Sequence, residues 1–244
     1  MHIEDATQVL GLSRTQAAKL LSRWTAQGWL QRVGTGAYVP VQLELHNSEI
    51  VIQDPWILVP VLFAPAYIGG RTAAEHWNLT EQIFRDIVVF TSRPLRVKTV
   101  ERQNAVFTLK HIREDLIFGT KTVWRGQSKL AVSDIHRTII DMLADPATGG
   151  GIQHVVDCFD QYMKRQDCAP DKLIAYADRI GNGAIFKRLG FLAERYPHGG
   201  SLLKASAQRL TKGYAKLDPA LVCNRLITRW RLYVPKTWVM GHDY

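Results

Sequence analysis

Paired carboxylates are the first residues to look for, because hydrolysis or nucleotidyl transfer with two metal ions needs several acidic ligands close together. The 244-residue sequence contains no Asp-x-Asp and no Asp-x-Glu. A restriction-type nuclease needs a carboxylate two residues before a strand lysine, yet Thr108 holds that position before Lys110. We therefore predict that the protein is not an enzyme and uses no metal and no cofactor.

Nucleophile and phosphate-binding patterns are also missing. The segment Gly149-Gly150-Gly151 is typical of a loop that enters a helix rather than of a phosphate-binding motif. A Ser-His-Asp triad stays open, since such triads are recognised by geometry. The three cysteines lack a Cys-x-x-Cys spacing, which predicts reduced thiols. The histidines are scattered, and we expect structural or surface roles for His76, His111, His136 and His154.

The N-terminal residues have a chemistry suited to nucleic acid. Between residues 13 and 23, one helical face carries short polar and basic side chains and no acidic one. A B-form major groove admits one α-helix, whose side chains reach base edges and phosphates. Thr15 and Gln16 are expected nearest to the bases. The predicted DNA-binding residues are Ser13, Arg14, Thr15, Gln16, Lys19, Ser22, Arg23, Arg32 and Thr35.

Two helices and a hairpin would position these side chains. The first helix is predicted over residues 3–10, ended by Gly11, and the second over residues 14–27, with Ser13 as its N-cap. Inward residues at helical spacing are expected at Ala17, Leu20, Leu21 and Trp24. Strands at 29–33 and 37–41 are joined through Gly34-Thr35-Gly36, and Trp29 and Tyr38 are expected in the core. This order predicts a winged helix-turn-helix over residues 1–50.

The remainder, residues 51–244, predicts a larger mixed α/β domain, so that the fold class is α+β. The domain boundary is expected near residue 50, and Asp54 should cap a helix over 56–64. A helix over 72–77 is followed by predicted strands at 87–91, 106–112, 116–118, 121–124 and 130–132. Helices are then predicted at 134–144, 152–165, 170–180, 184–196 and 202–210, and a last strand at 229–234 is expected to return to the sheet.

Basic charge predicts an acidic partner. The formal net charge is +9, and residues 181–244 contain eleven Lys or Arg against three Asp or Glu. Residues 1–53 carry four of each. We therefore predict a partner surface in the second domain that includes Arg137, Lys187 and Arg188, with Lys187 or Arg188 exposed beside an apolar helix face. An alternative for Arg137 is an ordinary helix pair with Asp141.

Composition excludes several classes of protein. Hydrophobic residues make up 46% and charged residues 22%, which is ordinary for a globular chain. The longest uncharged stretch, 55–70, is shorter than the roughly 20 apolar residues of a membrane span and contains three prolines. The first residues have no basic and apolar pattern of a secretion signal. A cytoplasmic protein is expected.

Several blocks resemble the AbiEi-family antitoxins of bacterial type IV toxin-antitoxin systems, which act in abortive infection. In the first domain the resembling segments are 9–14, 20–24, 28–30 and 36–40. Later segments are Tyr67-Ile68-Gly69-Gly70 with 73–77, Ser133-Asp134 through 137–141, 187–194, 213–219 and 230–232. Their order and spacing together carry the resemblance across nearly the whole chain.

The resemblance implies a winged helix that represses its own operon and a second domain that counteracts a nucleotidyltransferase toxin, directly or functionally. The implied partners are double-stranded operator DNA and the toxin. Family members carry one more helix ahead of the helix-turn-helix, so here either the start is truncated or residues 54–64 complete the small core. Two alternatives stay open: a stand-alone winged-helix regulator with a ligand-sensing or dimerisation domain, and a DNA-docking nuclease.

Overall fold

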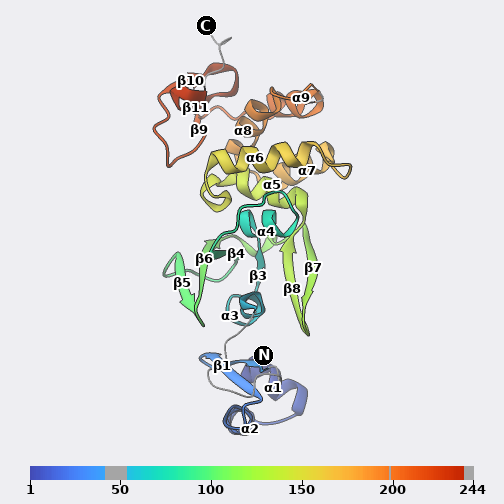
Figure 1. The fold of residues 1–244 in the computed structure, drawn as a ribbon, viewed down its shortest axis with the longest axis vertical. Coiled ribbons are helices and arrows are strands. Elements are labelled where there is room, and N and C mark those ends of the chain that lie inside the picture. The colour runs from blue at the N-terminus through green and yellow to red at the C-terminus, as the bar shows by residue number, and fades with distance from the viewer. Residues whose placement is uncertain (42–53, 198, 239–244) are drawn as a thin grey trace. The chain divides into compact units, whose positions relative to one another are not determined.

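The chain is a mixed α+β protein, and the computed structural model describes residues 1–41, 54–197 and 199–238 (Figure 1). It divides into two compact units. The first consists of Met1–Ile68, Arg85–Ile117 and Lys121–Val132, and the second of Gly69–Phe84, Phe118–Thr120 and Ser133–Tyr244. The boundary predicted near residue 50 lies outside the described residues and stays a prediction.

The first unit begins with the two predicted helices and the predicted hairpin. Helix α1 (Ile3–Leu10) ends at Gly11, whose φ of 64° is left-handed and suits glycine. Helix α2 (Arg14–Ala26) follows Ser13, its N-cap. Strands β1 (Leu30–Gly34) and β2 (Ala37–Pro40) then pair antiparallel. All four elements lie within one or two residues of their predicted positions.

A small core holds these elements together. Ala17 and Leu21 of α2 are fully buried, and Tyr38 of β2 packs with them, as predicted. Trp24 is partly buried against the same core. The expectation for Trp29 is wrong, because its side chain is 53% exposed. Side chains alternate along a strand, and the next residue, Leu30, takes the inward position.

A six-stranded mixed sheet makes up most of the remainder of the first unit. Its strand order is β5-β6-β4-β3-β8-β7. The strands are β3 (Ala66–Ile68), β4 (Asp86–Thr91), β5 (Thr99–Arg102), β6 (Ala105–His111), β7 (Thr120–Arg125) and β8 (Ser128–Ser133). Strands β3 and β5 were not predicted. The strand predicted at 116–118 is wrong, since Glu114–Leu116 forms the 3-10 turn η2.

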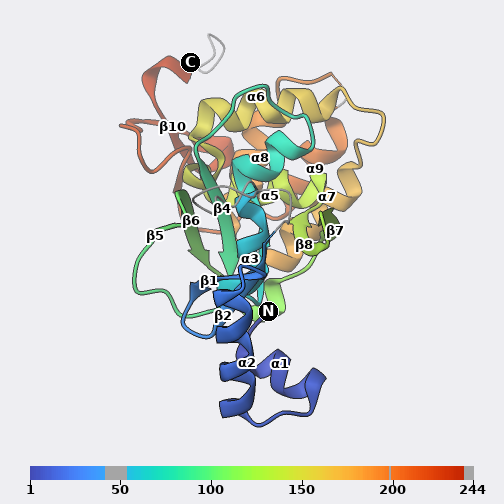
Figure 2. The same cartoon turned by 60° about the horizontal axis from the view of Figure 1, so that its bottom comes forward.

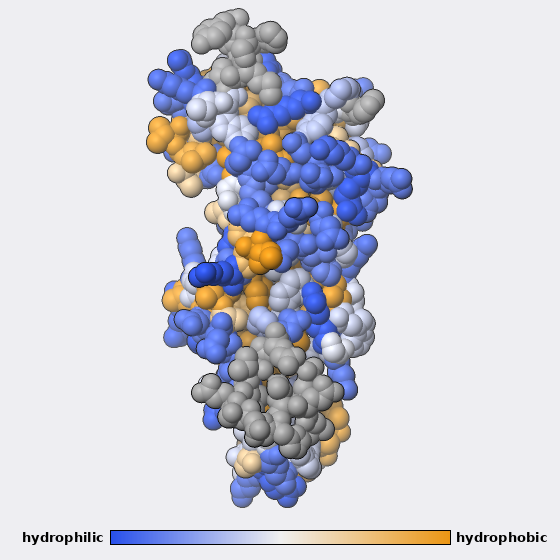
Figure 3. Space-filling view, viewed as in Figure 1, coloured by the Kyte–Doolittle hydropathy of each residue, from blue (hydrophilic) through white to orange (hydrophobic). Residues whose placement is uncertain are grey.

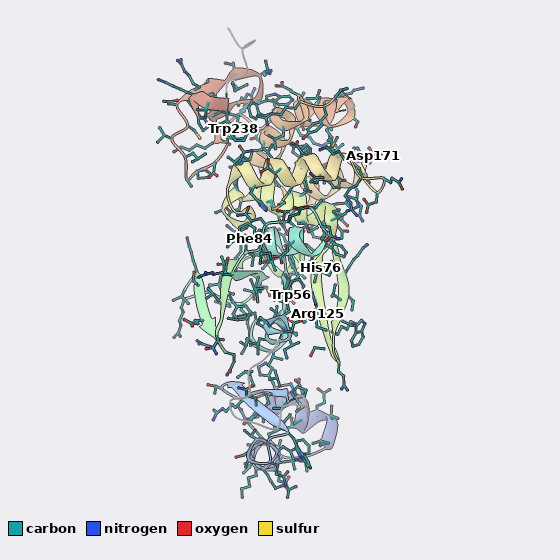
Figure 4. The ribbon with its side chains drawn as sticks, viewed as in Figure 1. Trp56, His76, Phe84, Arg125, Asp171 and Trp238 are labelled. Carbon is teal, nitrogen blue, oxygen red and sulfur yellow. The ribbon has the colours of Figure 1, made fainter. Side chains whose placement is uncertain are left out.

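The segment before the sheet is helical, as predicted, but shorter. It consists of the 3-10 turn η1 (Pro55–Leu58) and helix α3 (Val59–Leu62), and Asp54 accepts the Trp56 N–H at 3.0 Å. Arg125 of β7 lies 4.8 Å from the centre of the Trp56 ring (Figure 4). Helix α3 also contacts β2, but the small core of α1, α2 and the hairpin includes no residue of 54–64, so the idea that this segment completes it stays a prediction.

The second unit is mainly helical and is organised around α5. Its helices are α4 (Gly70–His76), α5 (Ile135–Ala144), α6 (Ile152–Met163), α7 (Pro170–Ile180), α8 (Gly183–Ala193) and α9 (Gly200–Gln208). Helix α5 contacts α4, α6, α7 and α8, and it lies among them in both views (Figures 1 and 2). Every residue from Ile135 to Leu143 is buried, so this helix is the centre of the core.

A third, separate sheet lies near the C-terminus. It consists of β9 (Ala215–Lys216), β10 (Arg225–Ile227) and β11 (Leu232–Val234) in the order β10-β11-β9. The expectation that the last strand returns to the large sheet is therefore wrong. Leu232 and Val234 are fully buried in the helical core, which keeps β11 in the second unit. No described helix has the length and apolar character needed to cross a membrane.

Candidate nucleic-acid interface

The outer face of α2 and the β1–β2 hairpin bring the predicted DNA-binding residues together. Thr15, Lys19 and Arg23 are spaced four residues apart, so they form one stripe along the helix. The stripe lies opposite the buried residues Ala17 and Leu21. All nine predicted residues are exposed: Ser13, Arg14, Thr15, Gln16, Lys19, Ser22, Arg23, Arg32 and Thr35.

The start of α2 commits Gln16 to the helix cap. Ser13 Oγ accepts the Gln16 N–H at 3.3 Å, and Gln16 Oε1 accepts the Ser13 N–H at 2.9 Å. This reciprocal arrangement is a capping box. The Ser13 hydroxyl also donates to Gln16 Oε1 at 2.9 Å. To read a base with both its amide oxygen and its amide nitrogen, Gln16 would have to leave the cap. Thr15 takes no part in the cap.

Two of the predicted cations are held in place within the first unit. Arg14 Nη2 lies 3.2 Å from Glu4 Oε1, and both side chains are mostly exposed. Arg32 Nε donates to the Gly34 carbonyl at 3.2 Å, close to the turn of the hairpin. Sequence reasoning missed Glu4 because it considered α2 alone, while this carboxylate comes from α1. Lys19 and Arg23 form no ion pair within the described residues, so they are the cations most available to a phosphate.

The residues predicted to form a partner surface on the second unit are buried. Arg137 is only 2% exposed, and its Nε donates to Asp141 Oδ1 at 2.8 Å. Its guanidinium carbon also lies 4.2 Å from the centre of the Phe118 ring. The prediction that Arg137 faces a partner is wrong, and the alternative of an ordinary helix pair with Asp141 is confirmed. The aromatic ring and the carboxylate together replace the water that this cation loses on burial.

Lys187 and Arg188 require the same correction, since each is only 3% exposed. Every residue of α8 from Ile185 to Ala193 is buried, so this helix has no solvent face on which a cation could remain. Lys187 Nζ donates to Thr211 Oγ1 at 2.8 Å and to the Gly213 carbonyl at 2.6 Å. Burial, and next the charge of Arg231, lower the pKa of Lys187. A role for either residue at a partner surface is therefore withdrawn.

Arg188 connects three segments through backbone carbonyls. Its Nη1 donates to Leu143 O at 2.7 Å, at the C-terminal end of α5. Its Nη2 donates to Lys216 O at 2.7 Å, and its Nε donates to Leu217 O at 2.9 Å. Burial lowers the pKa of Arg188, although the carboxylates of Asp145 and Asp218 oppose this effect. The guanidinium thus caps α5 and fixes β9 beside α8.

A polar cluster that the sequence analysis did not identify surrounds Asp134. This residue caps α5 by accepting the Arg137 N–H at 2.8 Å, and it also accepts Lys172 Nζ at 2.9 Å and the Tyr176 hydroxyl at 2.8 Å. Burial alone would raise the pKa of Asp134, but these hydrogen bonds outweigh it and hold the pKa below its ordinary value. The N-cap of α5 and two side chains of α7 account for this cluster. Its role is therefore structural: it holds α5 against α7.

The N-terminus of α6, which follows the glycine loop, is occupied by a carboxylate of the protein itself. Asp218 is 2% exposed, and its Oδ2 accepts the Ile152 N–H at 2.9 Å, at the N-terminus where an anion would bind. His154 is buried and bonds the Gly149 carbonyl at 2.6 Å, as expected for a structural histidine. Burial raises the pKa of the Cys158 thiol to about 12, so this cysteine is unreactive. Within the described residues no group of His, Cys, Asp and Glu is arranged to hold a metal ion.

Comparison with known proteins supports the fold. No family model matches the chain, and no curated protein matches it. The crystal structure of RV2827C protein from Mycobacterium tuberculosis is similar, with a TM-score of 0.62 and 15% sequence identity. The match covers 96% of this chain and 85% of that chain. At this identity the likeness concerns the fold alone.

Proposed function

We propose that the first 50 residues are a winged helix-turn-helix that binds operator DNA and represses the protein's own operon. The observation that supports this most is the exposed stripe of Thr15, Lys19 and Arg23 on α2, which carries no acidic side chain. A helix with such a face fits a major groove, and the β1–β2 hairpin stands next to it in the chain as a wing would. Arg32 and Thr35 of the hairpin then face the adjacent phosphates.

We further propose that the whole chain is an antitoxin of the AbiEi family and that its second unit counteracts a nucleotidyltransferase toxin. The order and spacing of the sequence blocks that resemble this family support the proposal. In the second unit these blocks coincide with residues that carry its packing. Lys187 and Arg188 bond carbonyls, and Gly190 lies against Trp230: a Cβ built on Gly190 would come 2.2 Å from Trp230 Cζ3. A resemblance at such positions is one of framework, so if the toxin is contacted directly, the contacting residues are others than these.

Operator binding is tested with the full chain carrying Lys19→Ala and Arg23→Ala. The salt dependence of binding to duplex DNA from upstream of its own gene is measured by fluorescence anisotropy. Each lost phosphate contact should reduce the slope of log K against log salt by about one unit, so a reduction of about two is expected. The control is Lys129→Ala, which removes an exposed cation of β8. Unchanged affinity and slope in the double variant would refute the assignment of α2 to DNA.

Antitoxin activity is tested by co-expressing the full chain with the gene next to its own and scoring growth. Rescue by the natural chain, retained in the Lys19→Ala and Arg23→Ala variant, is the expected outcome. It would place the activity apart from operator binding. If the neighbouring gene is toxic and the natural chain never rescues growth, the protein is a stand-alone winged-helix regulator instead.

A further inference from the structure

The small C-terminal sheet has one buried and one exposed face. Ile227, Leu232 and Val234 point into the helical core and are at most 4% exposed. Leu226 of β10 and Tyr233 of β11 are register partners, and Tyr233 is also paired with Lys216 of β9. Directly paired residues share a face of a sheet, so these three side chains lie together on the outer face. We call this surface, together with the neighbouring Tyr214, the tyrosine face.

Two aromatic rings dominate the tyrosine face. Tyr214 is 59% exposed and Tyr233 is 36% exposed, and their ring centres lie 5.7 Å apart at an angle of 53°. Neither hydroxyl bonds to a described residue. Hydrophobic residues appear among hydrophilic ones on the side of the molecule where β9, β10 and β11 lie (Figure 3). Exposed apolar surface marks a binding site when it is gathered in one patch rather than scattered singly, and these two rings adjoin.

The residues around these rings are basic. Lys216 shares the outer face with Tyr233, and Lys212 and Lys236 lie within three residues of the two tyrosines in the sequence. All three lysines are exposed, and within the described residues they form no ion pair. The only acidic residue between residues 212 and 236 is Asp218, which is buried at the start of α6. The tyrosine face therefore combines stacking surfaces with uncompensated positive charge.

We propose that the tyrosine face binds single-stranded RNA. Bases of a single strand can leave their stack and lie on an aromatic ring, while lysine and arginine follow the phosphates. A duplex keeps its bases stacked on one another, so it offers nothing to the two rings. The phenol hydroxyls of Tyr214 and Tyr233, which bond to no described residue, supply donors and acceptors for a ribose 2′-hydroxyl, which favours RNA over single-stranded DNA. An acidic protein would use the charge but not two open ring faces.

The test uses the full chain and a fluorescein-labelled oligouridylate of about 12 nucleotides, a length within the range that small sheet-based domains bind. Loss of both rings in the variant Tyr214→Ala and Tyr233→Ala should weaken binding by at least about 30-fold, since two stacked bases lose their ring partners. The variant Lys212→Ala and Lys216→Ala should reduce the salt slope by about 1.4. The variant Tyr214→Phe and Tyr233→Phe should retain most of the affinity and lose the preference for RNA.

Matched controls separate this proposal from operator binding. Trp124 is an exposed aromatic residue of β7, and Trp124→Ala should leave RNA binding unchanged. Lys19→Ala with Arg23→Ala should also leave it unchanged, so a failure of either proposal is recognised independently of the other. Equal affinity for oligodeoxyuridylate would overturn the choice of RNA. Equal affinity for polyglutamate, or full binding by the tyrosine-to-alanine variant, would overturn the proposal and indicate an acidic protein partner.

Discussion

Basic residues occupy opposite environments in α2 and in α8. Lys19 and Arg23 of α2 are exposed and form no ion pair within the described residues. Lys187 and Arg188 of α8 are buried, and their donors are satisfied by Thr211 and by backbone carbonyls. Lysine and arginine thus lie on the protein surface in α2 and in the protein interior in α8. A charge count therefore predicts an acidic partner only after burial has been assigned.

The neighbours of each helix produce this difference. Helix α2 packs on one side, where Ala17 and Leu21 are fully buried, and its other side is free for polar residues. Helix α8 is surrounded, since it contacts α5, α9, β9 and η4 (Thr228–Trp230). A cation on such a helix loses water on burial and must find replacement oxygen atoms. The free carbonyls at the end of α5 and along β9 supply them.

The largest effect is expected for Arg188→Ala. The substitution leaves the Leu143, Lys216 and Leu217 carbonyls without their donor, so the free energy of unfolding should fall by about 3 to 5 kcal/mol. Chemical denaturation followed by circular dichroism measures it. Lys19→Ala is the control from the exposed group and should change stability by less than about 0.5 kcal/mol. If both variants lowered the free energy of unfolding equally, the buried cation of α8 would be no more important for stability than the exposed one of α2.

A smaller loss is expected for Gly190→Ala, in the same buried helix. The added methyl group would lie 2.2 Å from Trp230 Cζ3, and overpacking of this kind costs about 1 to 3 kcal/mol. The matched control is Gly200→Ala at the start of α9, where a Cβ would meet nothing within 4 Å. Thermal melts of both variants test the expectation. If the two variants melted together, the contact between α8 and Trp230 would be unimportant for stability.

The sequence predicted the local elements better than their arrangement. Gly11 and Ser13 mark the boundaries of α1 and α2 because a left-handed glycine and an N-cap act within a single turn. Strand β3 was missed because it has only three residues, Ala66–Ile68, too few for a periodic pattern. The last strand was assigned to the wrong sheet because strand pairing depends on distant residues that no local pattern identifies.

The exposed residues of the candidate site were predicted well and the buried ones badly, because burial depends on contacts with distant residues. The exposed face of α2 follows from helical periodicity, so the six residues predicted on this helix are all exposed. The surface predicted for Lys187 and Arg188 was wrong because their apolar neighbours were assumed to define one inward face, whereas all sides of α8 are covered. The ion pair between Arg14 and Glu4 joins two helices and could not be read from either one alone.

The next effect concerns acid stability and the Asp134 cluster. Because the folded pKa of Asp134 lies below its ordinary value, the carboxylate stabilises the fold above pH about 4, and this contribution is lost as pH falls through the folded pKa. Asp134→Asn should therefore lower stability at neutral pH by about 1 to 2 kcal/mol and flatten its fall on acidification. Denaturation between about pH 2 and pH 7 measures both. Asp171→Asn, an exposed carboxylate of α7, is the control. If the stability of Asp134→Asn fell on acidification as steeply as that of the natural chain, other carboxylates would be responsible for the fall.

The smallest effect has the opposite sign and concerns Glu4, an acidic residue of α1 that contacts the α2 surface. Glu4 pairs with Arg14 at 3.2 Å, so Glu4→Gln should release this cation for a phosphate and tighten operator binding by up to about fivefold. The salt slope should become steeper by up to about one unit, because one more counterion is displaced from the DNA. Stability should fall by only about 0.3 to 1 kcal/mol, since a carboxylate in the first turn of α1 favours the helix dipole. Anisotropy titrations at several salt concentrations distinguish the two effects. The double variant Glu4→Gln and Arg14→Ala should lose the gain, whereas an unchanged gain would show that Glu4 acts by repelling the DNA directly.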